Sequence, residues 1–317
     1  MDRTLQSKQL SNANCGLEMK TSVTINSLLN NPLFLRILLN KSALKNIVFS
    51  IAAIIFIGGI IYSWENLNLS ANKLNVLPVV ILITFAIPVS IFLNSCETWL
   101  TARLANKRFG FLESLRLTII AIASNSLPIP GATIVRLSSL KKSGASTTTS
   151  IMITLTLIAI WAGVSFLFSG IYLLQIISWL GGASLAVGTT LLLGGVIGLH
   201  RTNKNWPLII YSIALKIFLT ATIILRMGLC LYAVGIEASI AQLSIFAIGG
   251  LLGSASSIVP AGLGLRELAS AVLAPISGIA ASAAFVATAL NRVISLLLSL
   301  LIYSVIHFCR QQNEQTY

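Results

Sequence analysis

The sequence predicts an all-α fold: a polytopic membrane helix bundle with about seven spans and one or two re-entrant helical hairpins. Two features of the composition lead to this prediction. Hydrophobic residues make up 56% of the 317-residue chain and charged residues only 9%, whereas a soluble domain carries about 25% charged residues. In addition, residues 145–199 contain no Asp, Glu, Lys or Arg. That stretch is long enough for two bilayer crossings of about 20 residues each.

The basic residues give the chain a formal net charge of +13, and many of them stand in short clusters between apolar segments. Lys107 with Arg108 and Lys141 with Lys142 are two such clusters. This distribution is the one that the positive-inside rule produces in membrane proteins. No basic stripe with interleaved aromatic residues is present in the sequence, so a nucleic-acid partner is not predicted.

The sequence predicts no metal, cofactor or catalytic site. Its four cysteines are scattered without a CxxC pair, and its two histidines, His200 and His307, stand far apart. Metal sites need such ligands at close spacing. No nucleophile–base arrangement, paired carboxylates or phosphate-binding loop is visible either. The sequence therefore predicts a membrane protein that binds its ligand and is not an enzyme.

Three regions follow from the polarity of the chain. Residues 1–44 form a polar N-terminal tail. Within it, residues 1–30 lack the apolar core of a cleavable signal, and residues 32–40 predict a short amphipathic helix at the membrane interface. Residues 45–309 predict a single transmembrane domain, and residues 310–317 a short polar tail. We expect the N-terminus to lie in the cytoplasm.

Apolar segments of sufficient length give the predicted spans. The second span contains Pro78 and Pro88, which predict a kinked helix whose freed carbonyl groups need partners inside the protein. The fifth span carries Lys216, which could snorkel to the interface, and the deeper Arg226, which could line a cavity. The predicted spans are residues 45–64, 76–96, 150–174, 180–199, 206–234, 240–259 and 279–308.

Residues 114–136 form an apolar segment that is interrupted by Pro128 and Pro130 and has basic clusters on both sides. The segment is too short for two crossings, and a single crossing would place one basic cluster outside the cell. A re-entrant hairpin that enters and leaves on the cytoplasmic side resolves this conflict. Such irregular backbone is tolerated at membrane depth only where it is buried in protein or lines a cavity, so this segment is a candidate functional element.

The segment at 124–136 has a counterpart at 254–266. In each, serines precede a proline and an arginine follows it. Broken segments at corresponding positions in two halves of a chain point to a transporter binding site; a chance match in serine-rich sequence stays an open alternative. Asn125, before the first break, could satisfy freed helix carbonyls or contact a ligand. The aligned pairs are Ser124 with Ser254, Ser126 with Ser256, Pro130 with Pro260 and Arg136 with Arg266.

The most informative motif is the sequence PAGLGLRE at 260–267. Pro260 predicts the end of a helix, and Gly262 and Gly264 permit backbone angles that are closed to other residues. Arg266 and Glu267 then open the next helix. A glycine turn before a helix N-terminus exposes backbone N–H groups to an anion, and the Arg266 guanidinium matches phosphate geometry. The alternative is a connector whose charges face the cytoplasm.

Asn291 and Arg292 interrupt the last apolar segment. A charge near the bilayer centre costs at least a few kcal/mol, so we expect Arg292 to pair with an acid or an anionic ligand, and Glu267 and Glu97 are the candidate acids. The alternative is that the helix begins later, which would leave Arg292 at the membrane interface. The candidate substrate-binding residues are Asn125, Pro130, Arg136, Pro260, Gly262, Gly264, Arg266, Glu267, Asn291 and Arg292.

Three motifs carry a family resemblance. NSLPIPGATIVRL at 125–137, SSIVPAGLGLRE at 256–267 and ALNR at 289–292 resemble the transmembrane region of lysylphosphatidylglycerol synthases, a family that includes stand-alone, YbhN-like, flippase-like membrane proteins. The resemblance covers roughly residues 45–308. It implies a multi-span bundle with re-entrant helices that moves a lipid across the bilayer. Since the chain ends at Tyr317, we expect no soluble aminoacyltransferase domain and no synthase activity.

One departure from the family affects the expected cargo. Members often carry Gly-Glu shortly before the arginine of the first motif, whereas Thr133-Ile134-Val135 stands here. With basic residues at Arg136, Arg266 and Arg292, the resemblance implies an anionic phospholipid or a lipid-linked sugar as the ligand. The expected location is the bacterial inner membrane.

The alternatives to a flippase-like transporter also stay open. One is a non-transporting accessory subunit of an envelope glycolipid or polysaccharide pathway, with a glycosyltransferase as its partner. Another is a membrane transferase that uses a lipid-phosphate donor, for which Glu267 or Glu97 would have to serve as the acid or base. A second copy of the chain is a further open partner.

Overall fold

Five long apolar helices dominate the structure, a computed structural model that describes residues 54, 56–63, 65–66, 75–124, 131–255 and 264–315. All of these residues belong to one unit, Ala52–Tyr317. Each long helix has the length and hydropathy of a bilayer crossing, and the described ranges contain no strand. The predicted all-α membrane helix bundle is confirmed, and the chain is an integral membrane protein. The N-terminal tail and most of the span predicted at 45–64 lie outside the described residues.

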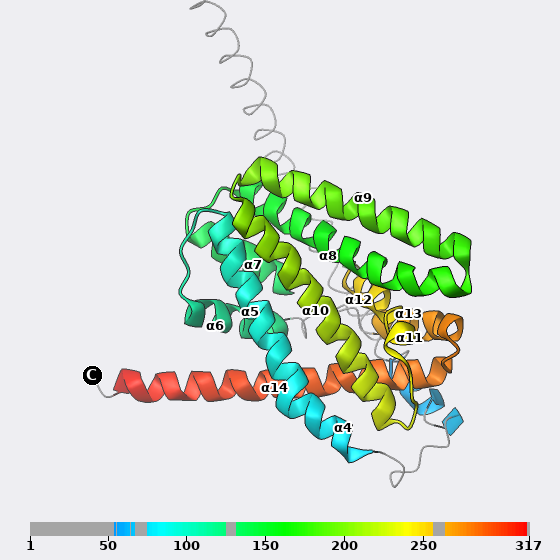
Figure 1. Cartoon of the computed structure of the whole chain (residues 1–317). Coiled ribbons are helices and arrows are strands. Elements are labelled where there is room, and N and C mark those ends of the chain that lie inside the picture. The colour runs from blue at the N-terminus through cyan, green and yellow to red at the C-terminus, as the bar shows by residue number, and fades with distance from the viewer. Residues whose placement is uncertain are drawn as a thin grey trace, which may run out of the picture. The chain divides into compact units, whose positions relative to one another are not determined.

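The helices follow one another along the chain with short connections (Figure 1). Hydropathy predicted four of the long helices, α8, α9, α10 and α14, to within a few residues at their N-terminal ends. Their bounds are α4 Val76–Ile81, the π-helical turn η2 Leu82–Ala86, α5 Ile87–Leu104, α6 Phe111–Ser124, α7 Gly131–Lys142, α8 Thr147–Ile176, α9 Ser178–Thr202, α10 Trp206–Ala233, α11 Ile240–Leu243, α12 Phe246–Ala255, α13 Leu265–Leu273, the 3₁₀ turn η4 Ala274–Ser277 and α14 Ala281–Gln315.

Helices α4 and α5 form one span that is interrupted by the π-helical turn η2. The backbone N–H of Ile87 donates to the carbonyl of Leu82, five residues earlier, and Pro88 follows directly. The wider turn accommodates a proline that lacks an N–H and crowds the preceding turn of an α-helix. The hydroxyl of Thr84 donates to the carbonyl of Val80 at 2.7 Å, so a side chain supplies a hydrogen bond at this irregularity.

Helix α5 runs to Leu104, although its span was predicted to end at residue 96. The charges of Glu97 and Arg103 look like the start of a loop in the sequence. In the structure Glu97 is buried inside the bundle and paired with cations from other helices. A charge that is neutralised in this way does not end a helix, which is why the predicted end was wrong.

Helices α8 and α9 lie side by side as a hairpin (Figure 1). Small residues at the contact let the two backbones approach closely, which is the usual basis of helix packing in membranes. A methyl group placed on Gly195 of α9 would lie 2.6 Å from Cγ1 of Ile160 and 3.0 Å from the carbonyl oxygen of Thr156 on α8. The hydroxyl of Ser184 on α9 also donates to the carbonyl of Phe166 at 2.9 Å.

We expect Gly195→Ala to lower the free energy of unfolding by about 1–3 kcal/mol, because the added methyl group overpacks the α8–α9 contact. The measurement is thermal unfolding of the purified protein in detergent. Gly194→Ala is the matched control, since a methyl group on Gly194 meets no atom within 4 Å and alanine favours the helix. Equal thermal unfolding midpoints for Gly195→Ala and Gly194→Ala would contradict the prediction and show that α8 and α9 tolerate a wider separation.

Two pairs of short helices accompany the long ones. Helix α6 (14 residues) packs on α7 (12 residues), and α12 (10 residues) packs on α13 (9 residues). Each is shorter than the roughly 20 residues of a full crossing. This pattern agrees with the two broken segments in the sequence, although the connections themselves, residues 125–130 and 256–263, lie outside the described residues. The re-entrant course of the chain stays a prediction.

The segment predicted as one span at 240–259 is divided. Helix α11 ends at Leu243 and α12 begins at Phe246, and the hydroxyl of Ser169 on α8 donates to the carbonyl of Ser244 between them at 2.7 Å. The carbonyl of Ser244 also accepts from the backbone N–H of Ala247 at 3.1 Å, so the break between the two helices does not leave it without a partner, as membrane proteins require. The apolar run in the sequence does not reveal the break.

Candidate functional site

A seam of charged and polar side chains runs through the interior between α5, α7, α10, α13 and α14. Glu267 is 0% exposed, Lys216 5% and Glu97 6%. Ionisable groups are costly inside a membrane and mark functional positions by default. We call this set the polar seam; its members are Ser90, Asn94, Glu97, Arg136, Lys216, Arg226, Arg266, Glu267, Asn291, Arg292 and Ser295.

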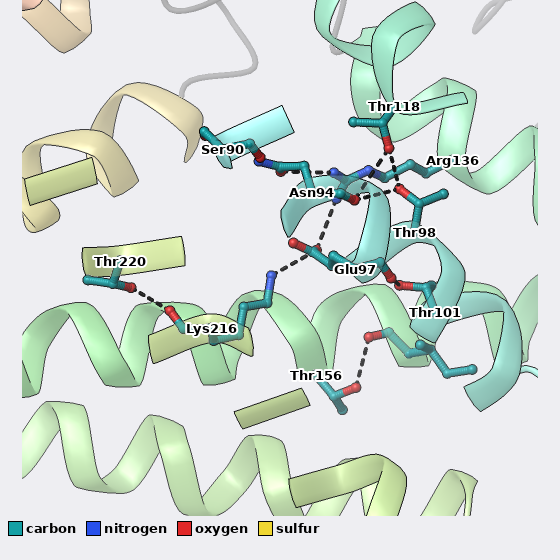
Figure 2. A network of polar contacts seen from close by, with 11 residues as sticks. Ser90, Asn94, Glu97, Thr98, Thr101, Thr118, Arg136, Thr156, Lys216 and Thr220 are labelled. Atoms are coloured by element: carbon teal, nitrogen blue, oxygen red, sulfur yellow. Dashed lines mark hydrogen bonds and ion pairs between the residues drawn. The ribbon is translucent and has the colours of Figure 1, made fainter. Parts of the chain in front are cut away.

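One end of the polar seam is centred on Glu97 of α5 (Figure 2). Its Oε1 atom accepts from Nζ of Lys216 on α10 at 2.8 Å and from Nη1 of Arg136 on α7 at 3.0 Å. The second guanidinium nitrogen, Nη2 of Arg136, lies 3.4 Å from Oδ1 of Asn94. A single carboxylate therefore links three helices and is shared by two cations.

Ser90, Asn94 and Glu97 share one face of α5, because residues three and four apart lie above one another on a helix. The side-chain amide of Asn94 donates to the carbonyl of Ser90 at 2.7 Å, and the hydroxyl of Ser90 accepts from Nη1 of Arg226 at 3.0 Å. Polar contacts thus continue from Arg136 along α5 to the second half of α10.

The middle of the polar seam is the Arg226 guanidinium, held against α14. Its Nε and Nη2 atoms donate to Oδ1 of Asn291 at 3.0 and 2.8 Å, and Nη2 also donates to the hydroxyl of Ser295. These acceptors are all uncharged. Since no carboxylate pairs with Arg226 among the described residues, its positive charge is solvated by dipoles and not neutralised.

The far end of the polar seam joins α13 to α14. Nη1 of Arg292 donates to Oε1 of Glu267 at 3.2 Å. Arg292 lies well inside α14, which begins at Ala281, so the alternative of a helix that begins later, near Arg292, is wrong; the depth of Arg292 in the membrane stays a prediction. Gly264 precedes α13 with φ of +80°, a left-handed conformation that favours glycine. Arg266 and Glu267 open this helix, as the motif predicted.

Arg266 lies beside this pair. Its Nη2 atom is near Gly250 of α12, where an added methyl group would approach it to 3.6 Å. The guanidinium interacts electrostatically with Glu267, which attracts it, and with Arg292 and Arg226, which repel it. Three arginines from three helices therefore face a region that contains one carboxylate.

The polar seam carries an excess of positive charge. Five cations, Arg136, Lys216, Arg226, Arg266 and Arg292, stand against the two carboxylates of Glu97 and Glu267, which leaves three charges without a counterion among the described residues. Two buried atoms, Nε of Arg136 and Oε2 of Glu267, have no hydrogen-bond partner there. The interior is thus suited to an anion that brings several oxygen acceptors.

Six of the predicted site residues belong to the polar seam or directly adjoin it: Arg136, Gly264, Arg266, Glu267, Asn291 and Arg292. The structure identifies Glu267, one of the two candidate acids, as the partner of Arg292. The other candidate, Glu97, pairs with Arg136 and Lys216 instead. Asn125, Pro130, Pro260 and Gly262 lie outside the described residues, so their predicted roles stay predictions.

Sequence reasoning missed several members of the polar seam. Lys216 does not snorkel, because it is buried against Glu97. The sequence predicts Arg226 only as a residue that could line a cavity, and it gives no signal for Ser90, Asn94 and Ser295. The sequence does contain a signal for the pair of Glu97 and Lys216. Glu97 stands at the end of one apolar span and Lys216 inside another, and each charge is destabilising in the membrane unless the two form an ion pair.

An apolar cavity of about 540 Å³ lies on another face of α10. Its lining includes Leu225, Leu229 and Tyr232 of α10, Phe168 of α8 and Leu243 of α11. No cation of the polar seam lines it. Glu237 is the one charged residue of its lining. The cavity is therefore separate from the cations of the polar seam, and its largely apolar lining suits a hydrocarbon chain.

No model of a known protein family matches the chain, and no curated protein matches it.

Proposed function

We propose that the chain is a flippase-like transporter that moves an anionic phospholipid or a lipid-linked sugar across the bacterial inner membrane, with its N-terminus in the cytoplasm. The observation that carries this proposal is the positive excess of the polar seam. Three uncompensated charges inside a membrane protein are costly, and an anionic headgroup would lower that cost by supplying the missing counterions.

The arginines around Glu267 are the proposed headgroup site. Arg266 and Arg292 come from two helices and Arg226 from a third, so a phosphate group among them would replace their mutual repulsion with attraction. Arginine suits this role because its planar fork donates two parallel hydrogen bonds to phosphate oxygens. Glu267 fixes the position of Arg292 and keeps part of the site neutral in the absence of ligand.

The test is a translocation assay with purified protein in phosphatidylcholine liposomes that contain a trace of headgroup-labelled phosphatidylglycerol. We expect wild-type protein to accelerate the loss of label from the protected leaflet. Arg266→Ala should lower the rate at least about tenfold, the effect of roughly 1.4 kcal/mol of lost binding in the rate-limiting state. Labelled phosphatidylcholine should move no faster than in protein-free liposomes.

Arg116→Ala is the matched control. Arg116 is an exposed arginine on α6 that takes no part in the polar seam, so its loss should leave the rate unchanged. If wild-type protein accelerates no anionic lipid, including polyprenyl-phosphate sugars, the transporter proposal is wrong. A stoichiometric glycosyltransferase that copurifies while Arg266 is dispensable would favour the accessory-subunit alternative instead.

A further inference from the structure

Glu97, Arg136 and Lys216 form a cluster, called here the Glu97 cluster, that takes no part in the proposed headgroup site. Its two cations differ in how deeply they are buried. One carboxylate is shared by two cations, although one cation suffices to neutralise it. Lys216 has 6% of its side chain exposed and stands in the middle of the 28-residue helix α10. Arg136 has 27% of its side chain exposed and stands on the 12-residue helix α7. If one partner leaves Glu97, it is Arg136.

The hydrogen bonds of Arg136 are incomplete. Its Nη1 atom is bound to Glu97 at 3.0 Å, its Nη2 atom reaches Asn94 only at 3.4 Å, and its buried Nε atom has no acceptor among the described residues. A buried donor without an acceptor is destabilising. An anion with two oxygens could accept from Nε and Nη2 together, the bidentate geometry that guanidinium groups prefer.

We propose that Arg136 is a second phosphate-binding residue, at which Glu97 competes with the phosphate of the ligand while Lys216 keeps Glu97 neutralised. Release of Arg136 leaves the Lys216–Glu97 pair intact at 2.8 Å, so no buried carboxylate is left without a counterion. Lys216 is thus a positioning residue, which acts on the ligand through Glu97 and does not contact it. The proposal rests on the proposed function in its choice of a phosphate ligand.

The polar seam connects this second site to the first. Asn94 and Ser90 on one face of α5 lead from Arg136 to Arg226. A headgroup could therefore exchange one set of donors for another without passing through a purely apolar region. Two sites in series are also a condition for movement, because a single tight site would hold the ligand in place.

The test compares two variants that both lack the lysine, Lys216→Met and Glu97→Gln/Lys216→Met. In the single variant Arg136 is the sole strong partner of Glu97, so the competition is strongest. In the double variant the competing carboxylate is absent and Arg136 is free. Replacement of a buried ion pair by uncharged groups of similar size is often tolerated, so we expect the double variant to fold.

The measurement is calorimetric titration of the detergent-solubilised protein with short-chain phosphatidylglycerol. We expect Lys216→Met to bind at least about fivefold more weakly than wild type, and the double variant to bind at least about fivefold more tightly than Lys216→Met, the lower range of typical coupling between sites. Arg136→Ala in the double variant should remove that gain. A parallel titration with glycerol phosphate distinguishes the source: the same order of affinities with this soluble probe indicates a site for free phosphate.

The opposite order would overturn the proposal. If Lys216 contacts the phosphate itself, the double variant binds as weakly as Lys216→Met. If the cluster is only structural, the folded fraction of every variant binds the lipid with wild-type affinity. Size-exclusion chromatography measures that folded fraction. Should Lys216→Met fail to fold, the double variant must still bind at least as tightly as wild type.

The failure of this inference is distinguishable from failure of the proposed function. Binding that follows the expected order without any acceleration of translocation would refute transport and leave the role of Glu97 standing. Translocation by wild-type protein that is unchanged in Lys216→Met, together with unchanged binding, would refute the role of Glu97 and leave transport standing.

Discussion

Replacement of Glu267 by alanine is expected to remove most of the folded protein. Glu267 is 0% exposed and accepts from Arg292 at 3.2 Å, and it is the sole described carboxylate that attracts Arg266. Without it, Arg266 and Arg292 repel each other in the interior. Loss of one partner of a buried ion pair costs about 3–5 kcal/mol, a large share of the roughly 5–15 kcal/mol that stabilises a folded domain.

The measurement is the yield of monodisperse protein after solubilisation, together with its thermal unfolding midpoint. Glu113→Ala is the control for loss of an acid, because Glu113 is exposed on α6. Glu267→Met combined with Arg292→Met should recover at least half of the lost stability, because it removes both charges of the pair. A single variant that unfolds at the wild-type midpoint would contradict the role assigned to Glu267.

Asn291→Asp is expected to separate stability from ligand binding. Oδ1 of Asn291 accepts from two nitrogens of Arg226 at 2.8 and 3.0 Å, and an aspartate of the same shape would accept both bonds with a full charge. The variant should therefore be at least as stable as wild type. Because it supplies an internal anion to the positively charged centre, it should bind anionic lipid at least about tenfold more weakly, a loss of roughly 1.4 kcal/mol.

Asn291→Leu provides the comparison. It removes the Oδ1 acceptor of both hydrogen bonds without adding charge, so it should lower the free energy of unfolding by about 2–3 kcal/mol. Calorimetric lipid titration and thermal unfolding of the two variants together form the test. If Asn291→Asp binds anionic lipid as tightly as wild type, the excess positive charge is not the basis of binding, and the proposed headgroup site is wrong.

The long helices were predictable because hydropathy reports local composition. Span length and charge clusters located α8, α9, α10 and α14 within the chain without any knowledge of contacts. The prediction failed where contacts decide the outcome. Helix α5 continues past Glu97 because distant cations neutralise that carboxylate, and the segment at 240–259 breaks where α8 supplies a hydrogen bond. Neither partner is a neighbour in sequence.

The candidate site was predictable to a similar degree. Arg292 was identified because a charge inside an apolar segment needs a partner, and the list of acids was short. The partner of Arg226 is an uncharged asparagine on another helix, which no charge pattern indicates. Ser90 joins the polar seam only because α5 faces α10. Such neutral acceptors depend on the packing of the bundle and are invisible in hydropathy.

The π-helical turn η2 has a consequence for how the chain tolerates changes in length. A π turn closes over five residues where an α turn closes over four, and each residue of an α-helix advances the rotation by about 100°. Shortening the segment between Ile81 and Ile87 by one residue would therefore let the π turn close as an α turn, and the remainder of α5 would keep its orientation. The same deletion in the regular helix between Ile87 and Ser90 has no wide turn to absorb it, so it would rotate Ser90, Asn94 and Glu97 away from α7 and α10 although none of them had been altered. The placement of charge in the interior thus depends on the number of residues in the helix before Ser90, as well as on which residues carry the charges.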